Sequence, residues 1–175
     1  MKLIKKPFAG VLVLEPKIYI DNRGFFLESF QKKRYKKYGI FEDFVQENHS
    51  RSKKNSLRGL HFTKNKKQSQ IVTVLRGRIF DVVVDIRKNS QNYGKWFGIE
   101  LSDNGPRQIY MTHGFAHGFC VLSEYADLHY MVSQYHDPKD ESGIIWNDPS
   151  IAIKWPIKKP NISKKDLKNL FLYNI

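Results

Sequence analysis

The sequence predicts an all-β fold, an antiparallel barrel or sandwich, and three observations support this. Short runs rich in Val, Ile, Phe and Tyr recur along the chain, which is typical of β-strands. Gly, Pro, Asn and Asp lie between these runs, where turns would join the strands. No helical patterns of about 10–15 residues alternate with the runs, which argues against a parallel α/β sheet.

Apolar runs bounded by turn residues define the expected strands. These strands cover residues 11–14, 17–20, 25–30, 44–48, 57–62, 71–75, 78–86, 96–101, 108–111, 118–122 and 126–132. The turn Asp21-Asn22-Arg23-Gly24 separates the second strand from the third. The dipeptide Arg76-Gly77 predicts a tight hairpin between residues 71–75 and 78–86.

Helices are expected in two short segments. Residues 31–38 form the best helix candidate outside the C-terminal tail. In that tail, residues 163–170 predict a short helix for which Ser163 is the N-cap, since a serine hydroxyl can accept a hydrogen bond from a free amide of the first turn. The chain shows no internal repeat, linker or low-complexity segment beyond lysine clusters, so residues 1–175 are expected to form one domain.

The composition is that of a globular protein with a strong excess of positive charge. Hydrophobic residues make up 41% of the 175 residues, charged residues 27%, and the formal net charge is +13. Such a surplus suggests an anionic partner. However, residues 71–153 carry 7 basic and 10 acidic side chains, so the excess lies in the flanks and is mainly lysine. A lysine-rich surface is therefore the plain explanation, and a nucleic-acid partner is not expected, because aromatic residues alternate with lysines only at residues 35–38.

The single cysteine, Cys120, excludes an intrachain disulfide and fits a reducing compartment. It lies in an apolar run and is expected to be a buried core residue. No segment approaches the roughly 18–20 apolar residues of a membrane span, and no apolar signal sequence follows the basic N-terminus. We therefore expect a cytoplasmic protein with no membrane partner.

Polar side chains interrupt several of the apolar strands. Arg58 and His61 lie in Arg-Gly-Leu-His-Phe, His117 lies between aromatic and glycine residues, and Tyr130 lies on a late strand. Small barrels bind ligands in their interior, and side chains alternate in and out along each strand. Each histidine alone could be an ordinary hydrogen-bonded core residue, but the four together favour a polar site inside the barrel.

The sequence gives little support for metal, nucleophilic or nucleotide-fold chemistry. His61 is followed by Phe62 and Thr63, so the His-x-His pair common in metal-binding barrels is missing. Glycines follow both His113 and His117, which argues against a helix that would align them. No serine lies in a Gly-x-Ser-x-Gly turn, and no glycine-rich dinucleotide or P-loop motif is present.

Nine segments of the chain carry a recognisable pattern: residues 21–28, 44–50, 57–62, 80–87, 114–119, 130–135, 145–149, 153–156 and 163–166. In their order and spacing, these segments resemble the dTDP-4-dehydrorhamnose 3,5-epimerases, a sugar-nucleotide branch of the cupin jelly-roll proteins. The resemblance runs from about residue 8 to residue 170. It implies a cupin jelly-roll barrel with a few short helices, a homodimer that exchanges N-terminal strands, and a reaction without metal or redox cofactor. The family reaction inverts carbons 3 and 5 of a nucleotide-linked 4-keto-6-deoxy hexose.

The resemblance also implies roles for individual residues. His61 matches the family's base, Asp166 the carboxylate that orients it, and Tyr130 the acid on the other face of the sugar. A proton next to a ketone can be removed if the resulting enolate is stabilised, and inversion then requires a proton from the opposite face. Arg58 and His117 match polar groups near the sugar ring.

Other positions match the binding of the nucleotide. Those implied to hold the nucleoside and diphosphate are Arg23, Glu28, Gln46 and Asn48, of which Arg23 and Glu28 are expected to reach across the dimer. Tyr135 matches an aromatic residue that stacks on the base. For Asp21 and Gly24, and for Asp148 and Pro149, we favour a structural role.

The chain departs from the family at two positions. Gln70 stands where the family usually has a lysine that helps the enolate oxygen, and Thr63 stands where a glutamine is common. Glutamine can donate a hydrogen bond but carries no charge, and hydrogen bonds to charged groups are the stronger ones. The departures suggest a different substrate or a changed balance between the two inversions.

Several functions are compatible with this sequence. The substrate is expected to be a dTDP-linked hexose or a GDP-linked 6-deoxy-heptose, used for capsule or O-antigen polysaccharide. Inversion of carbon 3 alone is an alternative. A catalytically silent sugar-nucleotide-binding module is a second alternative, against which the intact His61, Tyr130 and Asp166 argue. A metal-dependent cupin oxygenase is a third.

Overall fold

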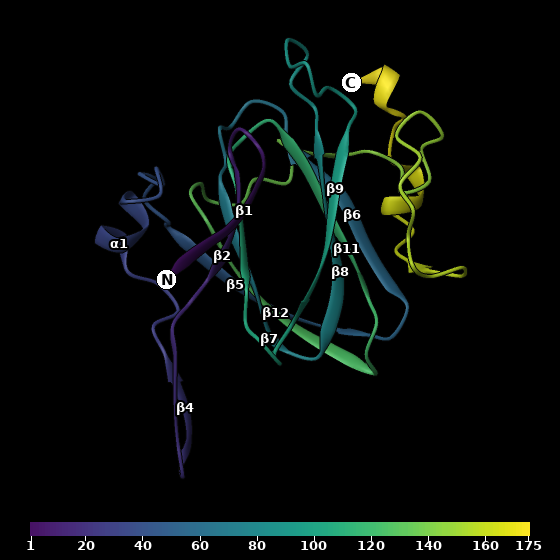
Figure 1. Cartoon of the computed structure of the whole chain (residues 1–175). Coiled ribbons are helices and arrows are strands. Elements are labelled where there is room, and N and C mark those ends of the chain that lie inside the picture. The colour runs from purple at the N-terminus through teal and green to yellow at the C-terminus, as the bar shows by residue number, and fades with distance from the viewer.

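The computed structural model describes residues 1–175 and shows two β-sheets that face each other (Figure 1). The first sheet has the order β1 (Lys2–Phe8), β2 (Val11–Glu15), β10 (Gln108–Met111), β7 (Gln70–Arg76), β12 (Tyr125–Val132) and β5 (Gln46–Lys53). The second has the order β13 (Glu141–Gly143), β6 (Ser56–Thr63), β11 (Phe115–Val121), β8 (Arg78–Asp85) and β9 (Trp96–Ser102), with β14 (Asn161–Ile162) beside β6. Every pairing except β14 with β6 is antiparallel. The expected all-β barrel-like fold is therefore confirmed.

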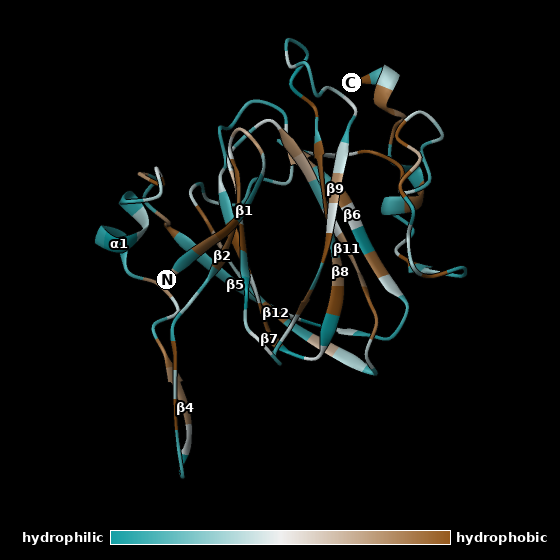
Figure 2. Cartoon of the chain, viewed as in Figure 1, coloured by the Kyte–Doolittle hydropathy of each residue, from teal (hydrophilic) through white to brown (hydrophobic).

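A separate hairpin projects from this body. It consists of β3 (Ile18–Asp21) and β4 (Gly24–Leu27), which pair with each other and with no other strand. Figure 1 shows it extending well away from the two sheets. The apolar side chains of Ile20, Phe25 and Phe26 are largely exposed on it, and Figure 2 shows brown segments there, outside the core. A two-stranded hairpin alone is marginally stable in water, so these side chains need a covering surface.

The core lies between the sheets because the strands alternate between two buried environments. On β8, Val83 belongs to the cluster between the sheets, which also contains Phe115 and Phe119 of β11. Val82 and Val84 point to the other face and pack with Ile144, Ile151 and Leu172 of the C-terminal third. The C-terminal segment therefore covers the outer face of the second sheet, as Figure 1 shows. Burial on both faces explains why residues 82–84 of β8 are all apolar and do not alternate with polar residues.

The predicted hairpin at Arg76-Gly77 is wrong. The strands on either side, β7 and β8, belong to different sheets, so the chain crosses from one sheet to the other at this turn. Gly77 has a φ of +82°, and a Cβ there would overlap the carbonyl oxygen of Tyr125. The Gly77 amide donates to Asp103 Oδ2 over 2.9 Å. A glycine turn fits this crossing as well as a hairpin, so local sequence could not distinguish them.

One predicted helix is confirmed and the other is wrong. The α-helix α1 (Lys32–Lys36) begins after Gln31, whose Oε1 accepts a hydrogen bond from the Arg34 amide over 2.7 Å. The C-terminal tail instead contains two 3-10 turns, η1 (Asp166–Lys168) and η2 (Leu172–Asn174). The Ser163 hydroxyl does accept a hydrogen bond from the Asp166 amide, at 3.0 Å. No α-helix forms in the tail, and Leu170, at the end of the predicted segment, forms a β-bridge with Ile144 instead.

Three strands were not expected from the sequence. Strand β1 is an exposed edge strand rich in lysine, so its sequence lacks the apolar pattern that would predict a strand. Lysines on an edge strand also disfavour pairing with a strand of another molecule. Strands β13 and β14 are too short to show a pattern. The structure contains no helix with the length and apolarity needed to cross a membrane.

Asp148 holds the C-terminal segment in place and should contribute strongly to stability. Its carboxylate is buried and accepts hydrogen bonds from the Leu172 amide at 2.6 Å and from the Ser150 amide at 2.8 Å. Burial raises the pKa of Asp148, but these hydrogen bonds outweigh it and lower the pKa overall. We expect Asp148→Asn to reduce the free energy of unfolding at pH 7 by about 2 kcal/mol, as for hydrogen bonds to charged groups.

The pH dependence of this effect tests its cause. A lowered folded-state pKa means that the ionised group stabilises the fold above its unfolded pKa, near 3.9, and that this contribution disappears as the pH falls through the folded value. Urea unfolding of both proteins should therefore show a smaller difference at pH 3 than at pH 7. Glu124→Gln, at an exposed position, is the matched control. An equal difference at both pH values would contradict the explanation.

Candidate functional site

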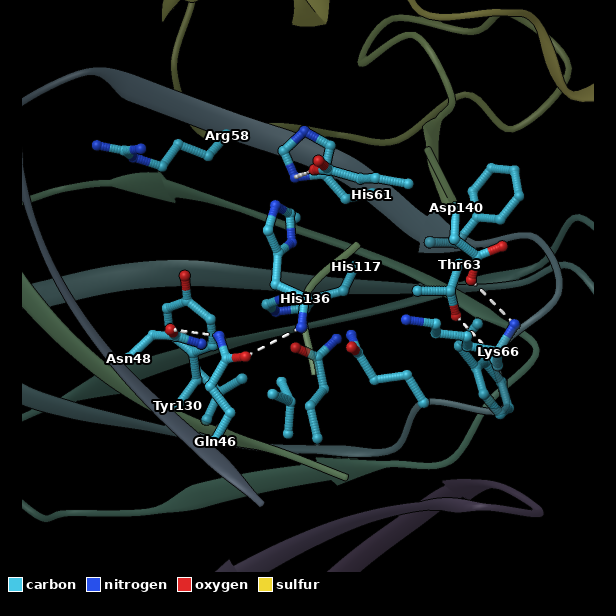
Figure 3. Close-up of a pocket in the computed structure, with 18 of the residues that line it drawn as sticks. Gln46, Asn48, Arg58, His61, Thr63, Lys66, His117, Tyr130, His136 and Asp140 are labelled. Carbon is cyan, nitrogen blue, oxygen red and sulfur yellow. Dashed lines mark hydrogen bonds and ion pairs between the residues drawn. The ribbon is translucent and has the colours of Figure 1, made fainter. Parts of the chain in front are cut away.

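A cavity of about 440 Å³ lies between the two sheets. Side chains from β5, β6, β7, β11 and β12 line it (Figure 3). The β6–β7 loop (residues 64–69) and the β12–β13 loop (residues 133–140) also line it, and we call these two loops together the mouth. The structure brings most of the expected site residues together here. Those that line the cavity are Gln46, Asn48, Arg58, His61, Gln70, His117, Tyr130 and Tyr135.

His61 and Asp166 form a hydrogen-bonded pair on one wall. His61 Nε2 lies 2.7 Å from Asp166 Oδ1, although 105 residues separate them. Asp166 is the first residue of the η1 turn, and its backbone amide donates a hydrogen bond to Ser163 Oγ. Its Oδ2 accepts a long hydrogen bond from the Gly59 amide, at 3.5 Å. Burial raises the pKa of Asp166, but the hydrogen bond from His61 and the backbone contacts outweigh it and lower the pKa overall. Asp166 is therefore ionised at neutral pH and holds the His61 ring.

A second His–Asp pair lies beside the first; His117 was expected near the site, but its partner Asp81 was not. His117 on β11 is directly opposite His61 in register, and its Nε2 lies 2.8 Å from Asp81 Oδ2. Asp81 is fully buried, and its other oxygen, Oδ1, has no hydrogen-bond partner. Asp81 interrupts the apolar run of β8, but no local pattern in the sequence identified it as the partner of His117.

Two glycines allow β6 and β11 to approach closely at this point. Gly59 has a φ of +116°, and a Cβ there would lie 2.6 Å from the Cα of Gly118. A Cβ on Gly118 would in turn lie 2.8 Å from the carbonyl oxygen of Arg58. Any larger residue would push the strands apart and separate the two histidines. The glycines therefore set the geometry of this wall.

Tyr130 lies across the cavity, on the other sheet. It is paired with Asn48 of β5 and Val72 of β7, so its position is fixed by a three-strand ladder. Burial raises the pKa of Tyr130, while the nearby Arg58 charge opposes this and Glu141 adds to it. The phenol is thus protonated at neutral pH and can donate a proton. Figure 3 shows the Tyr130 ring on the opposite side of the cavity from His61.

Arg58 and Gln70 add hydrogen-bond donors around the same space. Arg58 Nε donates to Ser52 Oγ over 2.9 Å, which fixes the guanidinium. The Gln70 amide nitrogen lies 3.3 Å from the Met111 sulfur, a weak acceptor. The amide of Gln70 is therefore only weakly engaged within the protein.

Polar contacts also connect the mouth to the strands. Gln46 Oε1 accepts a hydrogen bond from the His136 amide at 2.9 Å, and Gln46 Nε2 donates to Asn48 Oδ1 at 2.9 Å. Tyr135, the next residue back, is 67% exposed and borders the opening. Lys66 also lines the mouth, and sequence reasoning missed it, because a lysine in a lysine-rich loop carries no distinguishing pattern.

Arg23 and Glu28 lie outside the cavity of this chain. Arg23 is at the tip of the β3–β4 hairpin and pairs with Asp21 at 2.7 Å. The Asp21 carboxylate also accepts the Arg23 amide at 2.8 Å, as the turn interpretation of Asp21 predicts. Glu28 pairs with Arg34 at 2.7 Å. The expectation that Arg23 and Glu28 reach a partner's site stays a prediction.

The structure shows neither a reactive cysteine nor a cluster of metal-binding side chains. Cys120 is fully buried, as expected, and burial raises the pKa of its thiol to about 12, so the nucleophilic thiolate is scarcely populated at neutral pH. No group of three or more His, Cys, Asp or Glu side chains is arranged to hold a metal ion.

A jelly-roll barrel whose cavity has a hydrogen-bonded His–Asp pair on one wall and a protonated tyrosine on the other is consistent with a cupin-type isomerase. Comparison with known proteins makes the class specific: the family model for dTDP-4-dehydrorhamnose 3,5-epimerase matches residues 5–174. The chain belongs to this family and is an epimerase that acts on a sugar nucleotide.

Three relatives illustrate the match. The dTDP-4-dehydrorhamnose 3,5-epimerase of Salmonella typhimurium is 47% identical over 95% of this chain and 92% of its own length. The solved dTDP-6-deoxy-D-glucose 3,5-epimerase of Legionella pneumophila, in complex with dTDP-4-keto-L-rhamnose, is 45% identical with a TM-score of 0.96 and covers 99% of this chain and 94% of its own. A dTDP-4-dehydrorhamnose 3-epimerase of Streptomyces niveus is 38% identical over 98% of this chain and 84% of its own length. The expected cupin jelly roll and the class of enzyme are thereby confirmed.

Proposed function

We propose that this enzyme inverts carbons 3 and 5 of a dTDP-linked 4-keto-6-deoxy sugar by proton transfer between His61 and Tyr130. The observation that carries the proposal is the placement of the hydrogen-bonded His61–Asp166 pair on one wall and the protonated Tyr130 on the other. Inversion needs a base on one face of the sugar and an acid on the opposite face, and these groups meet that need.

The steps follow from the chemistry of a ketone. His61 removes the proton from carbon 3 or carbon 5, and the electron pair of that C–H bond moves into a C=C bond while the carbon 4 oxygen becomes an enolate. Asp166 holds the imidazole and stabilises its protonated form, as the carboxylate does in a catalytic triad. Tyr130 then delivers a proton to the opposite face of the same carbon, and the ketone re-forms. Proton exchange with water restores both side chains.

The enolate oxygen needs hydrogen-bond donors, and three side chains are candidates for this role. Arg58, His117 and Gln70 all line the cavity, and Arg58 is fixed by Ser52. Charge-assisted donors are roughly twice as strong as neutral ones, so the Arg58 guanidinium carries more of this stabilisation than the Gln70 amide. Gln46 and Asn48 of β5 are assigned to the nucleoside and diphosphate, and the exposed Tyr135 ring at the mouth is assigned to stacking on the base.

We also propose that the active form is a homodimer that exchanges N-terminal strands. The β3–β4 hairpin carries exposed apolar residues and has no partner strand within this chain. Strand β5, which carries Gln46 and Asn48, forms the outer edge of its sheet with one side unpaired. A hairpin from a second copy would satisfy both surfaces and would bring Arg23 and Glu28 to the partner's cavity.

Phe26→Asp should therefore dissociate the dimer. A buried, unpaired carboxylate in the interface would be strongly unfavourable, so we expect a monomer by light scattering coupled to size exclusion, with activity lost in parallel. Tyr173→Asp, at another exposed aromatic position, is the control and should stay dimeric. A fully active monomeric Phe26→Asp would refute the exchange.

Three alternatives keep the same site but change its substrate or outcome. Gln70, where the family usually has lysine, is the observation that favours them. The substrate could be a GDP-linked 6-deoxy-heptose, or carbon 3 alone could be inverted, as the name of the Streptomyces niveus relative indicates for that protein. In either case the product would be a precursor of capsule or O-antigen polysaccharide. A silent sugar-nucleotide-binding module is the third alternative.

A panel of sugar nucleotides in D2O distinguishes these functions. The enzyme is incubated with dTDP-, GDP-, UDP- and CDP-linked 4-keto-6-deoxy sugars, and mass shift and NMR report deuterium at each carbon. Deuterium at carbons 3 and 5 of the dTDP sugar supports the proposal. Label at carbon 3 only, or on the GDP sugar only, would replace it by the corresponding alternative. No label on any substrate would leave only the binding module.

A further inference from the structure

Lys66 is the only lysine side chain that lines the cavity, and the mechanism above does not use it. The other permanent cation of the lining is Arg58, which belongs to strand β6. The two lie at different ends of the cavity, with His61 and His117 between them (Figure 3). The cavity therefore carries a second positive charge at its mouth.

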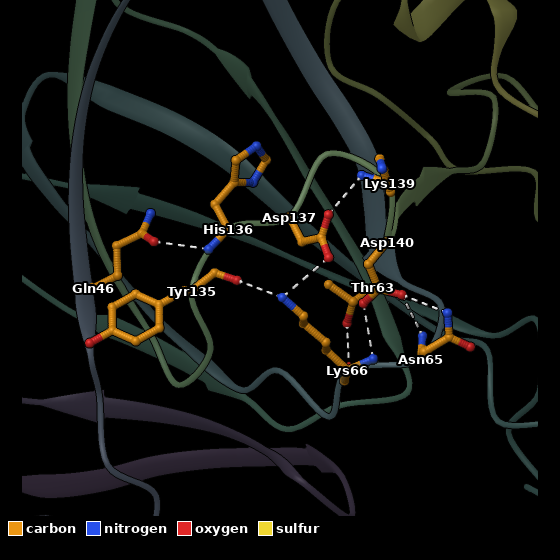
Figure 4. A network of polar contacts seen from close by, with 9 residues as sticks. All are labelled: Gln46, Thr63, Asn65, Lys66, Tyr135, His136, Asp137, Lys139 and Asp140. Carbon is orange, nitrogen blue, oxygen red and sulfur yellow. Dashed lines mark hydrogen bonds and ion pairs between the residues drawn. The ribbon is translucent and has the colours of Figure 1, made fainter.

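The backbone of Lys66 is rigidly held. Asp140 is 5% exposed, and its Oδ2 accepts the Lys66 amide at 2.9 Å while its Oδ1 accepts the Asn65 amide at 2.8 Å. The Lys66 carbonyl accepts the Thr63 hydroxyl at 2.6 Å and the Gln68 amide at 2.9 Å. These contacts tie the β6–β7 loop to the β12–β13 loop, as Figure 4 shows. Preorganisation of this kind is typical of residues that must present a side chain accurately.

The Lys66 side chain, in contrast, is loosely held. Its Nζ donates to the Tyr135 carbonyl at 3.2 Å and lies 3.4 Å from Asp137 Oδ2. Charge-assisted N–H···O contacts are usually about 2.7–2.9 Å long, so this ion pair is weak. Both side chains are more than a third exposed at the mouth. A stronger anion could therefore replace Asp137 at little cost.

We propose that Lys66 is a binding residue for the diphosphate of the substrate and exchanges Asp137 for a phosphate oxygen when the substrate binds. The inference rests on the proposed function, which assigns the base to Tyr135 and the sugar ring to the His61 wall. The diphosphate joins these two parts and must pass between them. Lys66 lies there, because its amine contacts the Tyr135 carbonyl and its carbonyl is held by Thr63, two residues after His61.

Binding measurements on the full-length protein test the phosphate contact directly. Isothermal titration calorimetry with dTDP and thymidine, and with GDP and guanosine, separates the diphosphate from the nucleoside. We expect Lys66→Met to weaken binding of the nucleoside diphosphate about tenfold and to leave nucleoside binding unchanged. Lys67→Met removes the same charge from an exposed neighbour in the same loop and should bind like the wild type.

A double-mutant cycle tests the exchange with Asp137. Asp137→Asn keeps a side-chain acceptor for the Lys139 amide, which Asp137 Oδ1 now accepts at 3.0 Å, but removes the competing charge. It should tighten binding of the diphosphate about threefold in the wild type and not in Lys66→Met. If Asp137 acted only by repelling the diphosphate, the gain would persist in both backgrounds and the exchange would be refuted.

Turnover separates this inference from the proposed function. With saturating substrate in D2O, Lys66→Met should keep its kcat and show a raised KM, since the contact serves binding rather than proton transfer. If the wild type binds dTDP or GDP but exchanges no deuterium, the proposed function is refuted. The calorimetry would then still test whether Lys66 contacts the diphosphate. Equal affinities of wild type and Lys66→Met, equal losses of diphosphate and nucleoside binding, or a wild type that binds neither diphosphate would overturn the inference.

Discussion

Replacing His61 by alanine should abolish deuterium exchange at both carbon 3 and carbon 5. The His61 imidazole lines the cavity and is held by the Asp166 carboxylate at 2.7 Å, and removal of a general base typically costs about 10²–10⁴-fold in rate. We expect kcat to fall about 10³-fold while the nucleoside diphosphate still binds. The measurement is the rate of deuterium incorporation in D2O, followed by mass spectrometry and NMR.

His113→Ala is the matched control for this variant. His113 is exposed and does not line the cavity, so its loss should leave exchange unchanged. Thermal unfolding of both variants checks that the fold is intact. Exchange that persisted at both carbons in His61→Ala at near wild-type rates would show that another group is the base.

Replacing Tyr130 by phenylalanine should separate proton removal from inversion. The ring keeps its packing between β5 and β7, but the hydroxyl that donates the proton is gone. His61 can still remove a proton and return one to the same face, so deuterium should continue to enter. Net inversion should fall about 10²-fold, with substrate affinity retained.

The pH profile gives a second check on Tyr130. Because burial raises the pKa of its phenol, the acid stays protonated at higher pH than a free tyrosine, whose pKa is about 10. The rate of inversion should therefore show no loss from Tyr130 ionisation below about pH 10. A Tyr130→Phe enzyme with the wild-type product distribution would exclude this residue as the acid.

The strands of the core could be predicted because their apolar side chains form short runs that must be buried. Runs such as Val82–Val84 must be buried on both faces, and only a strand between two apolar layers provides this. The polar residues His61, His117 and Tyr130 stood out for the same reason, since each interrupts an apolar strand. They could thus be assigned to a barrel interior from the sequence.

Long-range partners and loops could not be predicted in this way. Asp166 lies in a polar tail and Asp81 interrupts an apolar strand, but only the fold brings each to its histidine. The resemblance to the family supplied Asp166 but not Asp81. The Gly77 turn and the tail at Ser163 have local chemistry that fits more than one structure, so packing between distant segments decided the outcome. Lys66 depends on two loops that meet through Asp140, which no local pattern encodes.

The division between strands and loops has a consequence for how this enzyme can change. His61 and Tyr130, which we assign to proton transfer, and His117, which we assign to the enolate oxygen, are on strands that have neighbouring strands on both sides. The groups at the opening lie on two loops that are joined to each other through the Asp140 carboxylate. Insertions or substitutions in these loops can therefore alter which sugar nucleotide enters without moving the reacting groups. Selection for a new substrate can act on residues 64–69 and 133–140, while the strand-borne chemistry is inherited unchanged.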